Sequence, residues 1–447
     1  MIANRAPGIL VMLGAITLGT AGGSSQGTAG VREIAWTDVA PAIQRLLAAR
    51  GLDGATFAAH ISEIRRRNEA RVREGDLDHL IYYVLQSSSF TALPRIEPAV
   101  SAKAFVENGG SIPADARARL RAFAAAKRNA RDARLTYFHD LLAAEAEGVS
   151  RPDFLDGQYI RAMRFLHEKE FVAVRQPDGP QAVGALYQAR GLSTDTSVEA
   201  GYVVYLGLAT LQQLEPRRRI RSVLVVGPGL DVAPRTNLLD AGEPQSYQPF
   251  AVMDALLMLG LAARYEIKVA IVDINPRVVD WLERVRGTRR RLHLVSGVAE
   301  TDRVRFTSDF RQYFESIGKG LSTPTPLEER SGRLVKSMDM DLRVAPRFGM
   351  IRLDIVVDRI DRRFDLIVVT NVFPYLSDAE LLLALTNLTA MLAPGGVLLH
   401  NEPRPILAEA TSALRLALLH SRSVVIATVA GGESPLYDSI WMHRAPD

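Results

Sequence analysis

The 447-residue sequence contains no cysteine, which excludes disulfides, thiolate metal sites, iron–sulfur clusters and a cysteine nucleophile. Its eight histidines show neither H-x-H nor HExxH spacing, and His167 lacks a second histidine four positions later. A GxxxxGK phosphate-binding loop is also missing. We therefore expect no metal site and no chemistry based on such a loop.

Charge of one sign is not in excess. Lys and Arg together number 54, Asp and Glu 50, and the formal net charge of +4 is too small to indicate a nucleic-acid partner. The runs Arg65-Arg66-Arg67 and Arg289-Arg290-Arg291 have no aromatic residues interleaved and are interpreted as solvated faces. The 47% hydrophobic content is typical of a globular chain, and the length corresponds to two domains or three.

Long apolar runs are scarce. One lies near the start, where Arg5 precedes the apolar residues 9–18 (ILVMLGAITL) and the small residues 19–22. This pattern predicts an export signal, so residues 1–30 are interpreted as a signal peptide and linker. The run is about half of the ~20 residues that cross a bilayer, and no stable membrane span is expected. The localisation predicted is exported or periplasmic; the alternative is a cytoplasmic protein with a mis-assigned start or a flexible tail.

Residues 31–190 are predicted to form an all-α domain, because apolar residues recur there at spacings of three and four. Pro113 and Gly148 are expected to bracket one long helix. At the start of the next region, Thr196 and Glu199 have the spacing of a capping box for the helix that follows.

From Ile220 onward, short β-rich runs alternate with helices, which is typical of a parallel sheet covered on both faces. The fold class predicted for 191–447 is therefore α/β, with a Rossmann-like doubly wound sheet. Residues 423–429 and 437–443 are expected to pair as a C-terminal antiparallel hairpin. A second capping box is predicted at Ser377 and Glu380.

Three predicted strands end in residues suited to ligand binding. The first runs into a loop with Gly227, Gly229 and Asp231, whose glycines allow a ligand close to the backbone. The second ends in Asp273, a carboxylate able to accept hydrogen bonds from both hydroxyls of a ribose. The third is followed by Asn371, which offers a donor and an acceptor. In an open α/β sheet such strand ends lie at the ligand-binding edge.

Four segments together resemble class I S-adenosylmethionine-dependent methyltransferases, a likeness that covers roughly residues 195–445. They are VLVVGPGLD (223–231), VAIVDINP (269–276), FDLIVVTNVFPYL (364–376) and MLAPGGVLLHNE (391–402). The resemblance implies S-adenosylmethionine as cofactor and methyl transfer to an acceptor, a small molecule or a protein, that the sequence does not identify.

The same resemblance implies roles for individual residues. Gly227 and Gly229 would face the methionine and ribose part, with Asp231 in the same loop. Asp273 would face the ribose hydroxyls, and Asn371 the cofactor edge or the substrate. The DINP segment and the strand that ends before Asn371 look most like the chemotaxis-receptor methyltransferases, and in that comparison Asp354 lies by the adenine.

The sequence departs from the family pattern in the first strand and its loop. Val225 stands where an acidic residue is usual, and Asp231 replaces the third glycine. From Gly227 to Asp273 is 273 − 227 = 46 residues, about twice the ~20 of dinucleotide folds, so residues 231–250 are interpreted as an insertion.

Substrate-pocket candidates are Tyr247, Gln248 and Tyr375, for which core packing or a surface loop is the alternative. The glycines could serve only a tight turn, Asp273 a helix N-cap and Asn371 a turn. In-line methyl transfer depends mainly on alignment, and a general base is needed only if the acceptor must lose a proton. The sequence does not identify such a base.

Three other functions stay open for the whole chain. A non-catalytic exported protein could retain the fold for binding. An NAD-dependent oxidoreductase would need glycine in place of Val232, and aminopropyl transfer would need acidic residues around an amine, which the sequence does not locate.

Overall fold

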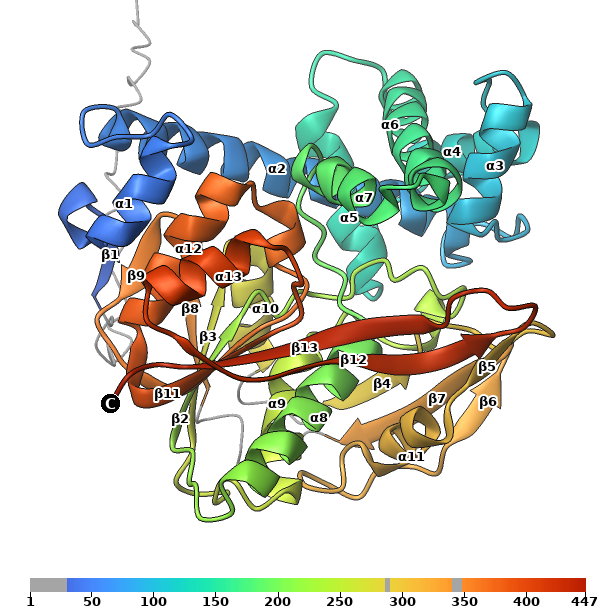
Figure 1. Ribbon diagram of the computed structural model, residues 1–447. Coiled ribbons are helices and arrows are strands. Elements are labelled where there is room, and N and C mark those ends of the chain that lie inside the picture. Colours follow the sequence, from blue (N-terminus) through green and yellow to red (C-terminus); the bar gives the residue numbers. More distant parts are fainter. Residues whose placement is uncertain (1–29, 286–289, 340–347) are drawn as a thin grey trace, which may run out of the picture.

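The computed structural model describes residues 30–285, 290–339 and 348–447. Almost all of the predicted signal peptide and linker lies outside these residues, so the export signal stays a prediction. Figure 1 shows a large twisted sheet with helices on both faces and a group of helices, α3 to α7, above one end of it.

The central sheet has eight strands in the order β8-β3-β2-β10-β11-β13-β12-β5. In that order they are β8 (Phe348–Arg352), β3 (Lys268–Asp273), β2 (Ser222–Val226), β10 (Phe364–Val369), β11 (Leu392–His400), β13 (Leu436–Arg444), β12 (Ala417–Val429) and β5 (Val304–Phe306). The five neighbouring strands β8, β3, β2, β10 and β11 run parallel to one another. Strand β13 runs antiparallel to both β11 and β12. The largely parallel sheet confirms the predicted α/β class.

The order of the strands reverses at the centre of the sheet. From β2 the chain adds β3 and β8 on one side and then β10 and β11 on the other. Ligands bind in open α/β sheets at such a switch point, outside the carboxyl ends of the strands. The ends of β2, β3 and β10, which carry the predicted site residues, meet there.

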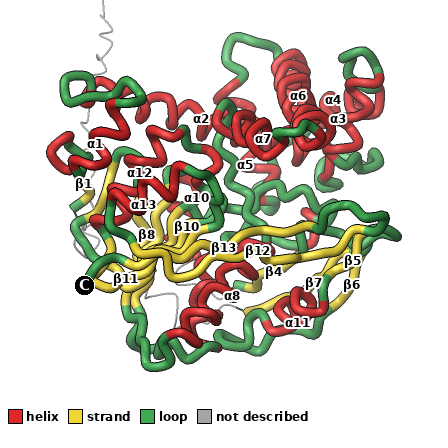
Figure 2. The backbone as a smooth tube through the Cα atoms, in the orientation of Figure 1, coloured by secondary structure: helices red, strands yellow, loops and turns green. Residues whose placement is uncertain are grey.

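Helices cover both faces of the sheet (Figure 2). They are α1 (Pro41–Ala48), α2 (Phe57–Gln86), α3 (Pro98–Glu107), α4 (Ala114–Ala125), α5 (Ala133–Glu145), α6 (Arg151–His167), α7 (Gly179–Gln188), α8 (Val198–Leu214), α9 (Gln248–Met258), α10 (Pro276–Val285), α11 (Ser308–Ser316), α12 (Asp378–Ala390) and α13 (Ile406–Ala413). In β2, Val223 and Val225 join the core cluster that contains α8 and α9, and Leu224 joins the one that contains α12 and α13. Because side chains alternate along a strand, β2 supplies both cores.

Helix α2 belongs to both core clusters. Ile61 and Ile64, near its start, pack with α1, α12 and α13, whereas Leu80 and Leu85, near its end, pack with α3 to α6. The 30-residue helix therefore crosses the carboxyl edge of the sheet and joins the helical group to it.

Two details of the first half differ from the prediction. Residues Val31–Glu33 form strand β1, which pairs antiparallel with β9 (Asp358–Ile360). The long helix expected between Pro113 and Gly148 is two helices, α4 and α5, with a break between them. Asp132 ends that break by accepting a hydrogen bond from the Leu135 N–H at 2.8 Å, which caps α5.

The described part of the chain between β3 and β8 forms an insertion with a sheet of its own. Strands β4 (Arg291–Val295), β7 (Arg333–Asp339) and β6 (Glu328–Arg330) form a separate three-stranded antiparallel sheet. Strand β5 from the same insertion pairs with β12 at the edge of the main sheet. The strands and helix of the insertion lie below α5 and α6 in Figure 1.

The described residues contain no helix long and apolar enough to cross a membrane.

The capping box at Ser377 and Glu380 is present at the start of α12. The Ser377 N–H donates to Glu380 Oε2 at 2.8 Å, and the Glu380 N–H donates to Ser377 Oγ at 3.4 Å. We expect Ser377→Ala to lower the free energy of unfolding by about 1 kcal/mol, because a backbone donor loses its acceptor. Urea denaturation would measure this. Ser377→Thr, which keeps the hydroxyl, should lose much less; an equal loss in both would exclude the cap as the cause.

Candidate functional site

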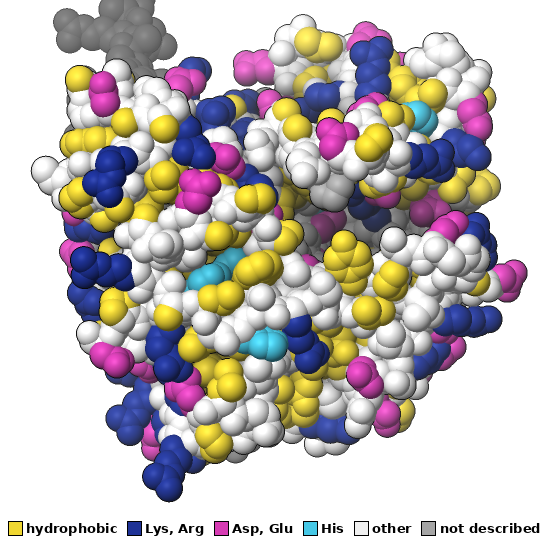
Figure 3. Space-filling view, viewed as in Figure 1, with side chains coloured by type: hydrophobic (Ala, Val, Ile, Leu, Met, Phe, Trp, Pro, Cys, Tyr) yellow, Lys and Arg dark blue, Asp and Glu magenta, His cyan; other side chains and the backbone are white. Residues whose placement is uncertain are grey.

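A cavity of about 710 Å³ lies at the carboxyl ends of β2, β3, β8 and β10. Its other walls come from α2, the segment before α8 (residues 191–197), the loop after β2, and the π-helical turn Glu168–Val172 that continues α6. Figure 3 shows the surface hollowed between the helical group and the part that contains the sheet, with charged side chains inside. Among the predicted site residues, seven line this cavity: Gly227, Gly229, Asp231, Asp273, Asp354, Asn371 and Tyr375.

The glycine loop after β2 is packed against the segment that precedes α8. Gly227 and Gly229 have φ of 62° and 70°, a conformation that favours glycine. A Cβ on Gly229 would lie 2.0 Å from the carbonyl oxygen of Thr194, and the Leu230 N–H donates to that oxygen at 2.8 Å. Glycine is therefore required here by chain packing, which also holds the loop at the cavity.

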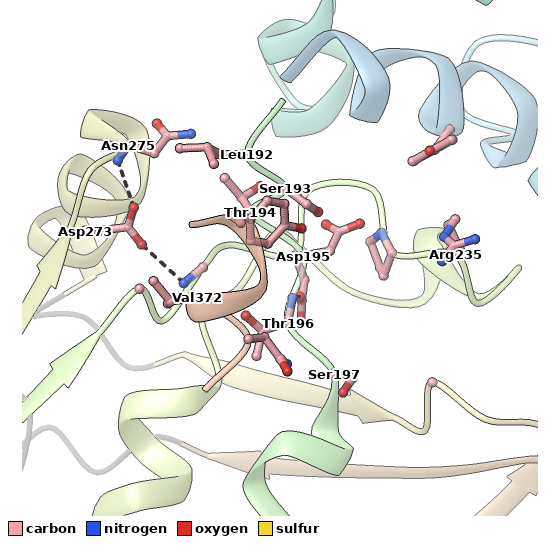
Figure 4. Close-up of a pocket in the computed structure, with 18 of the residues that line it drawn as sticks. Leu192, Ser193, Thr194, Asp195, Thr196, Ser197, Arg235, Asp273, Asn275 and Val372 are labelled. Atoms are coloured by element: carbon pink, nitrogen blue, oxygen red, sulfur yellow. Dashed lines mark hydrogen bonds between the residues drawn. The ribbon is translucent and has the colours of Figure 1, made fainter. Parts of the chain in front are cut away.

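Asp273 lies at the end of β3 with its carboxylate in the cavity wall. Oδ1 accepts the Asn275 N–H at 2.8 Å and Oδ2 the Gly229 N–H at 3.3 Å (Figure 4). Burial raises the pKa of Asp273 to about 6, although these two N–H groups offset part of the shift. Asn275, not Asp273, caps α10, since its Oδ1 accepts the Arg277 N–H at 2.9 Å.

Asp354 follows β8 and is held by a residue of α2. Its Oδ2 accepts Asn68 Nδ2–H at 2.9 Å and its Oδ1 accepts the Val356 N–H at 3.0 Å. Burial raises the pKa of Asp354 to about 6, partly offset by the Asn68 hydrogen bond. Apolar side chains, Leu353 and Ile355, line the cavity on either side of it. Such a pocket suits a flat ring that has a polar edge.

Asn371 has φ of 60° and lies at the exposed rim of the cavity. Its N–H donates to Asn401 Oδ1 at 3.0 Å, and its own Oδ1 accepts Asn401 Nδ2–H at 2.8 Å. The side chain therefore serves a turn between two strand ends while it borders the cavity.

Asp231 is buried and supports the cavity wall through the backbone of the neighbouring segment. Its Oδ1 accepts the Thr196 N–H at 2.9 Å. Burial, and then the nearby carboxylate of Asp195, raise the pKa of Asp231 to about 8. Both effects favour the protonated form of this side chain.

The capping box predicted at Thr196 and Glu199 is wrong. Thr196 Oγ1 donates to the Pro228 carbonyl at 2.8 Å, and Glu199 Oε1 accepts the Val298 N–H at 3.1 Å. The N-cap of α8 is Ser197, which makes no side-chain cap bond. Both members of the sequence pattern are thus used for tertiary contacts around the cavity.

The three substrate candidates are separated. Tyr375 lines the cavity, with its ring centroid 5.2 Å from that of Tyr187. Tyr247 is buried outside the lining, where its hydroxyl lies 3.1 Å from that of Tyr313. Gln248 is also buried outside the lining, and its Nε2–H donates to Thr370.

No group of three or more histidine or carboxylate side chains in the described parts of the chain is arranged to hold a metal ion.

No family model matches the sequence, and no curated protein matches it. Several of the solved structures that resemble the fold are methyltransferases. One is the N-methyltransferase NodS from Bradyrhizobium japonicum in complex with S-adenosyl-L-homocysteine (14% identity, 54% of this chain and 86% of that chain, TM-score 0.28). Another is a TehB-like SAM-dependent methyltransferase from Corynebacterium glutamicum (14%, 54% and 88%, 0.27). A third is a putative class I S-adenosylmethionine-dependent methyltransferase from Listeria monocytogenes (10%, 83% and 89%, 0.29). Identities and TM-scores this low do not carry a function from those proteins to this chain.

A pair that the sequence did not reveal joins the buried His79 of α2 to the partly buried Asp195 of the segment before α8. His79 Nδ1 lies 3.1 Å from Asp195 Oδ2, and His79 Nε2 lies 3.1 Å from Ser193 Oγ. Burial alone lowers the pKa of His79, but the carboxylates of Asp195, Asp76 and Asp78 outweigh burial and raise it. Asp195 lines the cavity. The two residues lie 116 positions apart (195 − 79 = 116), so no local pattern could have paired them.

Proposed function

We propose that the cavity binds S-adenosylmethionine and that the protein transfers the methyl group to an acceptor in the same cavity. The observation that carries the proposal is the placement of Asp273 and Asp354 beside the glycine loop, around one cavity at the switch point of the sheet. The doubly wound sheet is also the fold that the sequence resemblance implies.

The residues present fit this cofactor. Each oxygen of Asp273 accepts one backbone N–H, which leaves further lone pairs for the two hydroxyls of a ribose. Asp354, between apolar side chains, offers an acceptor for an exocyclic amino group. Thr194 Oγ1, beside the glycine loop, is buried without a partner among the described residues. This hydroxyl can donate a hydrogen bond to the methionine end of the cofactor.

The chemistry requires little covalent help from the protein. S-adenosylmethionine supplies an electrophilic sulfonium methyl group when bound. The chain's own residues hold the nucleoside and align the acceptor, and α2 with the segment before α8 forms a closure over the cavity that excludes water. Arg71 of α2 keeps that closure together, because its guanidinium donates to the carbonyls of Arg190 (2.8 Å), Tyr187 (3.1 Å) and Tyr375 (3.0 Å).

Isothermal titration of the full chain with S-adenosylmethionine and S-adenosylhomocysteine tests the proposal. We expect one saturable site with a Kd on the order of 1–100 μM, because a preformed pocket of this kind encloses most of the ligand. NAD, titrated in parallel, should not bind, since the loop lacks glycine at Val232. Absence of binding by either sulfur compound to folded protein, or preference for NAD, would contradict the proposal.

A further inference from the structure

The half of the cavity away from Asp273 contains two cations that share one carboxylate oxygen. Lys169 Nζ lies 3.1 Å from Glu170 Oε1, and Arg235 Nη1 donates to the same oxygen at 3.0 Å. All three side chains line the cavity. In Figure 4, Asp273 is seen at one end of the lining and Arg235 at the other, with Asp195 between them.

Several donors of these two cations have no partner among the described residues. Arg235 has five N–H groups and uses one on Glu170, while its guanidinium lies 5.8 Å from the centre of the Tyr82 ring. Lys169 has three N–H groups and uses one on Glu170 and one on the Tyr187 hydroxyl at 3.3 Å. The remaining donors belong to side chains in the cavity wall.

Neighbouring groups show that positive charge prevails here. Burial raises the pKa of Tyr187, yet Lys169, Arg190 and Arg235 together lower it below its ordinary value. Burial also raises the pKa of Glu170, and Lys169 and Arg235 reverse this shift. Asp78, a buried carboxylate outside the lining, is already paired with Arg190 and with Arg161.

Local backbone structure presents both cations to the cavity. Lys169 and Glu170 lie on the π-helical turn Glu168–Val172, a wider turn of a kind often found at functional sites. Arg235 lies on the loop after β2, which Arg134 of α5 fixes by donating to the Val232 carbonyl at 2.8 Å.

We propose that Lys169 and Arg235 bind the anionic group, a carboxylate or a phosphate, of the methyl acceptor. This inference rests on the proposed function. A guanidinium and an ammonium on one wall match the oxygens of either anion through charge-assisted hydrogen bonds. Asp195, which Figure 4 shows between Arg235 and Asp273, has its Oδ1 without a partner among the described residues, and it can accept a hydrogen bond from an amine or a hydroxyl. The acceptor class is therefore a small acidic molecule that carries an amino or hydroxyl group.

Titration of the full chain with inorganic phosphate and with malonate, at low ionic strength to limit screening, tests the subsite. We expect one saturable site for at least one of them, and the preferred anion identifies the group as phosphate or carboxylate. Arg235→Gln and Lys169→Met should each weaken binding about tenfold or more, because a charge-assisted hydrogen bond is lost.

Glu170→Gln gives the sharpest test, since it removes the carboxylate that competes for both cations. Anion binding should become several-fold tighter, a gain that no general loss of stability produces. Arg175→Gln serves as the control, because Arg175 is exposed, lies outside the lining and carries the same charge. Anion binding that is absent in the wild type, or equal in Glu170→Gln, Arg235→Gln and Arg175→Gln, would overturn the subsite.

S-adenosylhomocysteine titrated into each variant separates this inference from the proposed function. Binding of the sulfur compound without any anion site would overturn the inference alone. Binding of the anion without the sulfur compound would support an anion site and contradict the methyltransferase proposal.

Discussion

Gly75→Ala should lower the free energy of unfolding by about 2 kcal/mol or more, although the same change inside a helix ordinarily raises it by up to about 1 kcal/mol. Gly75 lies in the middle of α2, where a Cβ would stand 1.8 Å from the carbonyl oxygen of Leu192. A Cβ on Gly191 would likewise stand 2.3 Å from the Gly75 nitrogen. The helix and the segment before α8 thus cross backbone to backbone, so a methyl group must push them apart. Urea denaturation followed by circular dichroism measures the change.

A matched glycine separates this clash from the helix-propensity effect. Gly157 lies inside α6, and a Cβ built there meets no heavy atom within 4 Å. Gly157→Ala should therefore stabilise the protein by up to about 1 kcal/mol. If Gly75→Ala proves as stabilising as Gly157→Ala, the close crossing of α2 and the segment 191–197 is not a feature of the folded protein.

The main features of the α/β half could be predicted because its information is local. A buried strand that ends in glycine, aspartate or asparagine is visible in a few residues, and the parallel sheet then brings such ends to one edge. Gly227, Gly229, Asp273 and Asn371 accordingly line a single cavity, and Asp354, which only the family resemblance implied, lies there too. Strand alternation and turn glycines do not depend on distant parts of the chain.

The helical half shows the limit of periodicity. Leu120 and Leu135 are 135 − 120 = 15 residues apart, close to four helical turns, so the apolar pattern stays in phase across the break at 126–132. The apolar side chains of both helices are buried in one core cluster, so their spacing predicts a single helix. Only the polar residues of the break, with Asp132 as a cap, mark the interruption.

Residues of the cavity that come from the first half could not be identified from the sequence. Asn68 and Lys169 line the cavity, and His79 pairs with Asp195 of its wall. All three lie in helical segments where a polar residue ordinarily faces solvent. The partners of Asn68 and His79, Asp354 and Asp195, are far away along the chain. The two capping boxes make the same point, since the spacing is identical at Ser377 and at Thr196. At Thr196 the tertiary contacts with the glycine loop take precedence over the local pattern.

Asp273→Asn should weaken S-adenosylhomocysteine binding by about 10- to 100-fold, because a charged acceptor for the ribose hydroxyls is lost. The pH dependence should change as well. The pKa values of Asp273 and Asp354 are both about 6, raised by burial, so both carboxylates are ionised above that pH and take up protons below it. Wild-type affinity should be constant above about pH 7 and fall on acidification by about tenfold per pH unit for each carboxylate that must be ionised. Isothermal titration between pH 5 and 8 gives both quantities.

Asp273→Asn should halve the slope of the logarithm of affinity against pH below about pH 6, because only Asp354 is left to titrate. Asp254→Asn is the matched control, because Asp254 is also a buried carboxylate that accepts backbone N–H groups, from Gly318 at 2.7 Å and Gly320 at 2.8 Å, but lies outside the cavity lining. It should lower stability without changing the affinity of the folded protein or its slope against pH. Equal losses of affinity in the two variants would mean that Asp273 acts only through the fold, and an unchanged slope in Asp273→Asn would mean that its carboxylate does not bind the ribose.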